Sequence, residues 1–518
     1  MAPASPDRKL SWREWLGFMS MVVGMFMAIL DIQIVSSSIA EIQAGLSASS
    51  DEVSKVQTSY LIAEIVMIPL SGWLSRLLST RVLFTISAIG FTVFSFMCAL
   101  AGSLQVMVLF RACQGFIGGA MIPTVFATSF LLFPGAKRAG ISVLIGLTAT
   151  LAPTIGPTLG GWLTQQLSWH WLFLINVPVG ALVAFNVWTF LDIDRPNPGL
   201  ARSFDAVGLV LMAAFLGCLE YVLEEGNRND WFSDPVVFDL AVVAAVAGGF
   251  FFWRMLTRPD PLVDLKAFRN ANFAFGCLFS FVVGIGLYGS VYVIPLFLGR
   301  VRGYDSLQIG ETMFVTGLTM FAAAPIAGKL ARKMDMRRML AGGLIGFGTS
   351  VWWLAHLNNQ SAFWDLLGPQ ALRGGSMMFV MLPVNQLALG TLPPAQLKNA
   401  AGLYNLMRNL GGAIGLALIN TVATARLAVH TLHLDEQVTW SRPAAMQSLA
   451  GMTQAFTPGA ESRAHLISLA RMAQMVQRES LTLTYNDVFL LMSLCFAAAV
   501  PLTLLLKKPK PAAPSEAH

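Results

Sequence analysis

Residues 104–132 read LQVMVLFRACQGFIGGAMIPTVFATSFLL and contain a single charged side chain, Arg111. A helix needs about 20 apolar residues to cross the roughly 30 Å hydrocarbon core of a bilayer, so this stretch predicts a transmembrane helix. The whole chain of 518 residues has the same character, with 55% hydrophobic and 12% charged residues. Because soluble domains carry about 25% charged residues, the composition excludes a soluble enzyme, a disordered chain and a secreted disulfide scaffold.

Similar apolar stretches recur along the chain. They predict an all-α polytopic membrane protein with 14 transmembrane helices, at residues 14–36, 54–74, 81–101, 104–132, 140–163, 169–192, 206–225, 236–256, 272–298, 309–330, 338–357, 366–391, 398–424 and 485–506. The five cysteines lie inside these stretches and form no C-x-x-C pair, which argues against disulfides and metal sites. A phosphate-binding Walker pattern is absent from the sequence, which disfavours transport driven by ATP.

Basic residues indicate how the helices are oriented. If the N-terminus is cytoplasmic, the cytoplasmic segments and the two tails hold 22 of the 34 Lys and Arg residues. Cytoplasmic loops of membrane proteins carry such an excess of positive charge. The sequence therefore predicts two cytoplasmic tails, residues 1–13 and 507–518.

The chain also repeats itself. GWLSR at 72–76 is matched by GKLAR at 328–332, and PGAKRAG at 134–140 is matched by PAQLKNAAG at 394–402. A duplication explains both pairs. It predicts a six-helix bundle at 14–192, a second one at 272–506, and two inserted helices at 206–256. Such paired halves are typical of secondary transporters, which bind substrate near the membrane midplane between the halves. The first repeated segment and its surroundings provide the candidate gating residues Gly72, Arg76, Arg81, Gly328, Arg332 and Asp335.

Charged residues inside the predicted spans are the candidates for chemistry, because each costs roughly 2.5–3.5 kcal/mol to insert. The acids are Asp31, Glu64 and Glu220, and the bases are Arg111, Arg373 and Arg408. Counting about 1.5 Å per residue places Asp31 and Arg111 in the outer third of the membrane and Glu64 near its midplane. We expect these three residues to couple transport to protons, with a purely structural Asp31–Arg111 pair as the alternative. Glu220 is interpreted as a surface acid near the outer end of an inserted span.

Proton coupling has a simple physical basis at such an acid. If protonation and the binding of a cationic substrate exclude one another at one carboxylate, the two fluxes run in opposite directions. The predicted substrate cavity is lined by Glu64, Tyr60, Gln33, Gln114, Arg373, Asn405 and Arg408.

Two further segments stand out. Residues 152–161 read APTIGPTLGG, and their small side chains allow close helix packing. Residues 425–484 form a long external loop, in which Met446, Leu449, Met452 and Phe456 recur at helical spacing, as do Leu466, Leu469, Met472 and Val476. This pattern predicts two amphipathic helices that rest on the outer membrane surface or against a partner. His430 and His433 are three residues apart but do not form a metal-binding cluster with acidic and Cys ligands, so no metal site is expected.

Four motifs in order resemble one family. They are LDIQIV at 30–35, RACQG at 111–115, the segment 152–161 and WHWLFLINVPVG at 169–180. Together they resemble the fourteen-span drug:proton antiporters of the major facilitator superfamily, of the EmrB/QacA type and its EmrB branch in particular. In that family the segment 152–161 is the antiporter motif, here with Pro153, Gly156, Pro157, Gly160 and Gly161. The family's loop motif Gly-x-Leu-x-Asp-Arg-x-Gly has lost its aspartate, which Arg76 replaces, and its later glycine, which Ser79 replaces.

The resemblance implies a transporter rather than an enzyme, with no cofactor and with the proton gradient as its energy source. It implies export of hydrophobic or amphipathic compounds from the cell inner membrane, with a periplasmic adaptor and an outer-membrane channel as partners and no nucleic acid. Two alternatives stay open. One is a dedicated exporter of a single metabolite, such as a fatty acid, a siderophore or a signal molecule. The other is a non-transporting membrane receptor or subunit.

Overall fold

The computed structural model describes residues 11–49, 52–133, 136–455 and 461–507, and this part of the chain is helical without a strand. Its α-helices are α1 (Trp12–Ser37), α2 (Ile39–Gly45), α3 (Lys55–Leu78), α4 (Thr80–Ala99), α5 (Leu104–Gly118), α6 (Met121–Leu132), α7 (Ala136–Gln166), α8 (Trp171–Leu174), α9 (Asn176–Phe190), α10 (Ala206–Glu225), α11 (Pro235–Thr257), α12 (Ala271–Arg300), α13 (Ser306–Leu330), α14 (Met336–Leu354), α15 (Phe363–Leu389), α16 (Pro394–Asp435), α17 (Pro443–Ala455) and α18 (Glu461–Ala499). The prediction of an all-α protein is confirmed.

Twelve helical segments within the described residues are long and apolar enough to cross a membrane, so the protein is a multi-pass membrane protein. They correspond to twelve of the fourteen predicted spans. The other two predicted spans also form helices, α14 and α15, which are more polar. Helix α14 begins with Arg337 and Arg338 in its first turn, and α15 carries Asp365 and Arg373.

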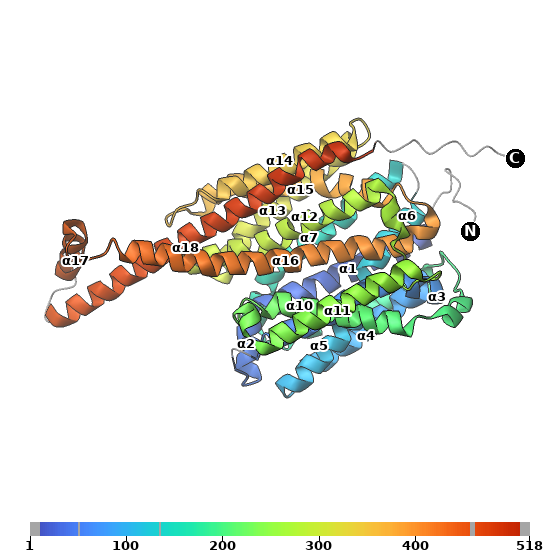
Figure 1. Ribbon diagram of the computed structural model, residues 1–518, viewed down its shortest axis with the longest axis horizontal. Coiled ribbons are helices and arrows are strands. Elements are labelled where there is room, and N and C mark those ends of the chain that lie inside the picture. Colours follow the sequence, from blue (N-terminus) through green and yellow to red (C-terminus); the bar gives the residue numbers. More distant parts are fainter. Residues whose placement is uncertain (1–10, 50–51, 134–135, 456–460, 508–518) are drawn as a thin grey trace.

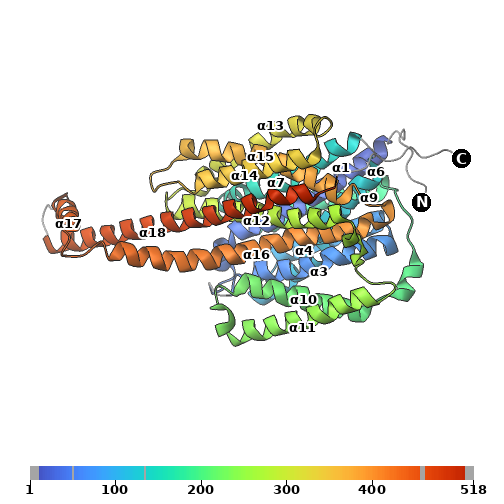
Figure 2. The ribbon, with the colours of Figure 1, turned by 45° about the horizontal axis from the view of Figure 1, so that its top comes forward.

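The helices form one elongated bundle (Figure 1). Before the inserted pair α10–α11, α1 packs against α7 and α9, and α3 packs against α5; after it, α12 packs against α16, and α13 against α15. Contacts between these two groups run through α7 with α13 and through α16 with α3 and α6. Helices α10 and α11 pack against each other along one edge of the bundle (Figure 2), and α10 also touches α3 and α16.

Two glycines show how the groups repeat each other. A Cβ atom on Gly115 of α5 would lie 2.3 Å from the carbonyl oxygen of Tyr60, and one on Gly374 of α15 would lie 2.1 Å from that of Thr316. Neither position can hold a larger residue without moving a backbone, so both mark close helix crossings. Tyr60 and Thr316 are 256 residues apart, the same offset as Gly72 and Gly328. The close crossings therefore follow the sequence repeat.

The two longest helices extend beyond the bundle. Helices α16, with 42 residues, and α18, with 39, project together, and α17 packs against α18 at their far end (Figure 1). We call this end of the molecule the hairpin end, and the opposite end, where α1 begins, the terminal end. Residues 425–484 were predicted to form two amphipathic helices on the membrane surface or against a partner, and in the described part they form the end of α16, the short helix α17 and the start of α18. No proline interrupts α16 after its first residue, and α18 contains neither proline nor glycine, so both spans continue as helices. Phe456 lies outside the described residues.

Candidate functional site

A buried ion pair joins α1 to α5. Asp31 and Arg111 are both fully buried, and Nη1 of Arg111 lies 2.6 Å from Oδ2 of Asp31. The other carboxylate oxygen, Oδ1, accepts hydrogen bonds from Nδ2 of Asn176 at 2.7 Å and from Nε2 of Gln114 at 3.3 Å. The carboxylate of Asp31 on α1 thus has donors from two other helices, α5 and α9, which is the kind of environment that a buried charge requires.

Arg111 also has several partners, although its Nη2 is buried without a hydrogen bond among the described residues. Its Nη1 also donates to Oε1 of Gln114 at 2.7 Å, and its Nε donates to the carbonyl oxygen of Val56 at 3.3 Å. The ring centroid of Tyr60 lies 4.2 Å from the guanidinium carbon, in the range of a cation–π contact. The depth estimate correctly brought Asp31 and Arg111 together. The ion pair fits both the structural and the coupling interpretation, so a coupling role for Asp31 stays a prediction.

Glu64 has a different environment. It lies one turn after Tyr60 on α3 and is 3% exposed, yet its carboxylate has no hydrogen bond or ion pair with any residue that the structure describes. The charges of Arg111, Arg408 and Asp31 all act on it. A buried carboxylate without a partner is costly, so it is a candidate for a site that takes up a proton or a cation.

Arg408 brings a positive charge from α16 toward the same region. Its Nη2 donates to Oδ1 of Asn405 at 2.6 Å, its guanidinium carbon lies 5.2 Å from the ring centroid of Phe126 on α6, and its Nη1 has no partner among the described residues. Glu64 and Arg408 therefore lie where helices from both groups meet, with opposite charges and incomplete hydrogen bonding.

Arg373 is not part of this region. Its Nη2 donates to Oγ1 of Thr316 at 2.8 Å, and Thr316 donates to Oε1 of Gln370 at 2.9 Å. If Gly374 is equivalent to Gly115, Gln370 takes the place of Arg111, and Arg373 lies one turn further along. The C-terminal group thus has an arginine in this network but no carboxylate to pair with it, in the described chain.

Helix α7 carries the small residues of the antiporter-like segment. A Cβ atom on Gly156 would lie 2.4 Å from Cβ of Gln33, so Gln33 packs against α7. A Cβ atom on Gly310 of α13 would likewise clash with the side chain of Thr158, so α7 lies between α1 and α13. Both prolines, Pro153 and Pro157, lie inside one continuous helix, and Gly160 and Gly161 are buried.

The terminal end holds a latch that the sequence did not reveal. Lys398 of α16 forms an ion pair with Asp194, which follows α9, and donates to the carbonyl oxygen of Ser75 at 2.8 Å. Asp194 also accepts from the backbone N–H of Thr80 at 3.0 Å, at the start of α4. Gly72 lies beside this latch, because its Cβ would be 2.8 Å from Cα of Asn399. Asp194, in the loop after α9, therefore lies near the loop motif in which Arg76 replaces the family's aspartate.

Of the other predicted gating residues, Arg76 lies beside this latch, because it follows Ser75 and acts electrostatically on Lys398, whereas the remaining ones have other surroundings. Arg81 lies over the ring of Trp188 at 5.3 Å, and Asp335 pairs with Arg337 at 2.8 Å and caps its own helix. Arg332 is exposed, and a Cβ atom on Gly328 would lie 3.9 Å from the Val143 side chain. Nε of Arg76 is buried without a hydrogen bond among the described residues.

Glu220 corrects another prediction. It is 5% exposed rather than at the surface, and its Oε2 has no hydrogen-bond partner among the described residues. Sequence periodicity could not find this, because an inserted helix surrounded by apolar residues gives no sign of which face touches the bundle. Asn176 was also not predicted as a site residue, although it lies inside the motif at 169–180.

Comparison with known proteins identifies the family. A sequence model described as Major Facilitator Superfamily matches residues 21–416. The chain belongs to the major facilitator superfamily. Within it, the chain is 44% identical to the Colistin resistance protein EmrB of Acinetobacter baumannii, covering 96% of this chain and 97% of the relative. It is 32% identical to the Multidrug export protein EmrB of Escherichia coli, with 93% of each covered, so it is an EmrB-like member.

Two further similarities complete the comparison. The Fatty acid resistance protein FarB of Neisseria gonorrhoeae is 28% identical over 95% of this chain and 96% of its own. Among solved structures, the human organic anion transporter MFSD10 (TETRAN) matches with a TM-score of 0.55 at 14% identity, covering 93% of this chain and 99% of that one. At that identity the likeness concerns the fold alone. This EmrB-like chain therefore has the all-helical major facilitator fold and belongs to a family of transporters.

Proposed function

We propose that this EmrB-like protein is a proton-coupled exporter of hydrophobic and amphipathic compounds. Glu64 carries this proposal, since it is a buried carboxylate without a partner at the junction of the two helix groups. A receptor or a non-transporting subunit has no need for such a group. In this proposal Asp31 and Arg111 position the helices around Glu64. The cavity that receives the cargo is bounded by Tyr60, Gln114, Asn405 and Arg408.

The membrane arrangement is part of the proposal. Helices α14 and α15 cross the membrane together with the twelve more apolar segments, which gives fourteen spans in two six-helix halves and an inserted pair. The terminal end faces the cytoplasm, because the basic residues gather there, and the hairpin end faces the periplasm. The inner membrane of a cell with two membranes is the setting that the EmrB-named relatives suggest.

Transport into liposomes tests this function directly. The purified protein is reconstituted, a pH difference is imposed across the membrane, and accumulation of ethidium, a cationic amphiphile, is measured. We expect accumulation against the ethidium gradient that stops when a protonophore collapses the pH difference. Ethidium that only equilibrates, or that ignores the protonophore, would contradict proton-coupled export.

A dedicated exporter of an anionic metabolite is the second candidate. Arg373 and Arg408 are buried arginines without a carboxylate partner among the described residues, and such groups suit an acidic head group. The relative FarB is named for fatty acid resistance. Competition between ethidium and oleate in the same liposomes separates the two candidates, because a dedicated exporter would transport only one of them.

Replacing Glu64 by Gln is expected to change the cargo preference. The substitution keeps the shape and removes the charge, so a cationic cargo loses a charge-assisted contact of about 1.5–3 kcal/mol, or more than tenfold in transport, whereas a neutral cargo loses less. Initial rates for ethidium and for an uncharged dye measure this. Glu311→Gln is the control, because it removes an exposed carboxylate. Equal losses for both dyes would show that Glu64 does not select charge.

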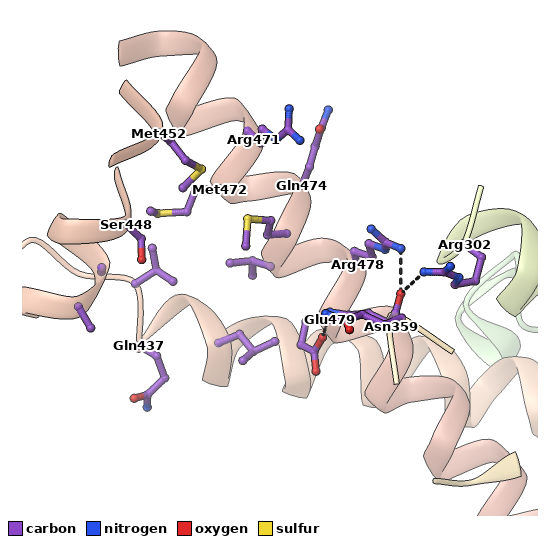
Figure 3. A pocket seen from close by; sticks show the side chains of 17 residues that line it. Arg302, Asn359, Gln437, Ser448, Met452, Arg471, Met472, Gln474, Arg478 and Glu479 are labelled. Carbon is purple, nitrogen blue, oxygen red and sulfur yellow. Dashed lines mark hydrogen bonds between the residues drawn. The ribbon is translucent and has the colours of Figure 1, made fainter. Parts of the chain in front are cut away.

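The hairpin end provides a surface for the proposed periplasmic adaptor, which would connect to an outer-membrane channel. A cavity of about 960 Å³ opens between α16, α17 and α18. Figure 3 shows Met452 and Met472 on its inner wall, and Arg302 and Arg478 both donating to the carbonyl oxygen of Asn359 at 2.8 Å. Flexible methionine side chains suit a surface that adapts to a partner helix.

Deleting residues 440–480 is expected to leave folding intact and to weaken cellular resistance. The cut is well placed, because His430 lies 2.8 Å from Asp487 and the two helices are therefore adjacent below it. Membrane level and thermal unfolding should match the full chain, while survival in toxic compounds falls. If cells with the shortened protein survive as well as cells with the full protein, the hairpin end has no docking role. Liposome transport, which needs no adaptor, is the control.

A further inference from the structure

Helix α10 presents acidic side chains to the rest of the bundle. Glu225 accepts a hydrogen bond from Oγ1 of Thr58 at 3.1 Å, and a Cβ atom on Gly217 would lie 3.4 Å from Ile62. These two contacts show that α10 runs antiparallel to α3. Glu220 lies between them, level with residues 59–63, and so roughly 2–8 Å along the axis from Glu64.

Glu220 and Glu64 share two unusual properties. Both are at least 95% buried, and neither forms an ion pair with a described residue. Glu64 and Glu224 both act on Glu220 electrostatically. Glu224, one turn closer to the hairpin end, is partly exposed. The three carboxylates therefore form a series that leads from the hairpin end of the molecule to its centre.

The other charged groups around Glu220 leave this series intact. Tyr288 of α12 interacts with both Glu220 and Glu64, and Arg408 of α16 interacts with Tyr288 and Glu64. On α11, Asp239 is exposed and Asp234 caps its own helix. Arg111 and Arg408 act on Glu64 electrostatically, and neither Glu64 nor Glu220 forms an ion pair with a described residue. Two buried carboxylates that lack ion-pair partners repel each other when both are ionised, and a proton on either one relieves that repulsion.

We propose that Glu220, from the inserted helix α10, relays protons between Glu224 at the hairpin end and Glu64 at the centre. The inference rests on the proposed function, because it supplies the route by which the driving proton reaches the cargo site. Each step moves one proton from a carboxylic acid to a carboxylate, and no other bond changes. The inserted pair α10–α11 thereby takes part in energy coupling.

Two assays on the same liposomes separate a relay from a cargo contact. Counterflow exchanges labelled for unlabelled ethidium without net proton movement, whereas accumulation under a pH difference requires protons. We expect Glu220→Gln to reduce accumulation at least about tenfold, since positioned proton-transfer groups contribute factors of this size or more. Counterflow should stay near the wild-type rate. Glu225→Gln is the matched control, because it removes a neighbouring charge on α10 and can still accept the bond from Thr58; it should behave as wild type.

Infrared spectroscopy gives a readout that does not depend on transport. The carbonyl band of protonated carboxylic acids should lose one component in Glu220→Gln, and the pH dependence of the Glu64 component should change with it. Wild-type accumulation by Glu220→Gln, or an unchanged infrared titration, would overturn the relay. Loss of counterflow together with accumulation would also overturn it, because Glu220 would then contact cargo or support folding. Wild-type protein that fails to accumulate ethidium would overturn the proposed function itself, and the relay with it.

Discussion

Asp31→Asn is expected to abolish accumulation driven by a pH difference and to lower the stability of the protein. The carboxylate receives donors from Arg111, Gln114 and Asn176. Removing one partner of a buried ion pair leaves the other charge uncompensated, at a cost of about 3–5 kcal/mol. Ethidium accumulation in liposomes and the thermal unfolding temperature of the purified variant measure the two effects at matched protein amounts.

The double variant Asp31→Asn/Arg111→Gln separates coupling from structure. It removes both charges and leaves side chains that can hydrogen-bond to each other, so the unfolding temperature should recover toward wild type. If accumulation stays absent, the charged pair is needed for coupling. If accumulation returns as well, the pair is structural only. Full activity in the single variant Asp31→Asn would contradict both roles.

Lys398→Met is expected to open the terminal end of the molecule. The substitution keeps the alkyl chain but removes the ion pair to Asp194 and the bond to Ser75. Hydrogen bonds to charged groups contribute about 1.5–3 kcal/mol, so the equilibrium between closed and open forms should shift by more than tenfold. Unlike a change at Asp194, it preserves the bond from Asp194 to the start of α4.

Thiol labelling measures this opening. Ser75→Cys, in a background whose five native cysteines are replaced by serine, places a buried thiol next to Lys398. A membrane-impermeant maleimide should label it faster when Lys398→Met is added, and Lys398→Arg should label almost as slowly as the parent. The swapped pair Asp194→Lys/Lys398→Asp should restore slow labelling. An unchanged rate in Lys398→Met would show that the latch does not hold this end closed.

The sequence predicted what depends on local patterns. Apolar length located the helices, and counting residues along them brought Asp31 and Arg111 to one depth, because a helix advances by a fixed rise. The ion pair of the latch could not be predicted from the sequence, because Asp194 and Lys398 are 204 residues apart. Their contact depends on how the loop after α9 returns to the bundle. Glu220 was misplaced because hydrophobicity around an inserted helix does not distinguish a face toward lipid from a face toward protein. The hairpin was missed because the amphipathic pattern of an outer helix fits both a membrane surface and packing against another helix.

Helix α16 connects the centre of the bundle to the hairpin end as one continuous helix. It holds Arg408 at the centre of the bundle and continues without interruption to Asp435 at the far end. Asp435 is 27 positions after Arg408, a rise of about 40 Å, so each degree of tilt of the C-terminal helices would move the tip sideways by about 0.7 Å. Rocking of one half against the other, the motion by which secondary transporters alternate, is therefore magnified outside the membrane. A partner protein bound at the tip of α16 would therefore be displaced sideways in every transport cycle.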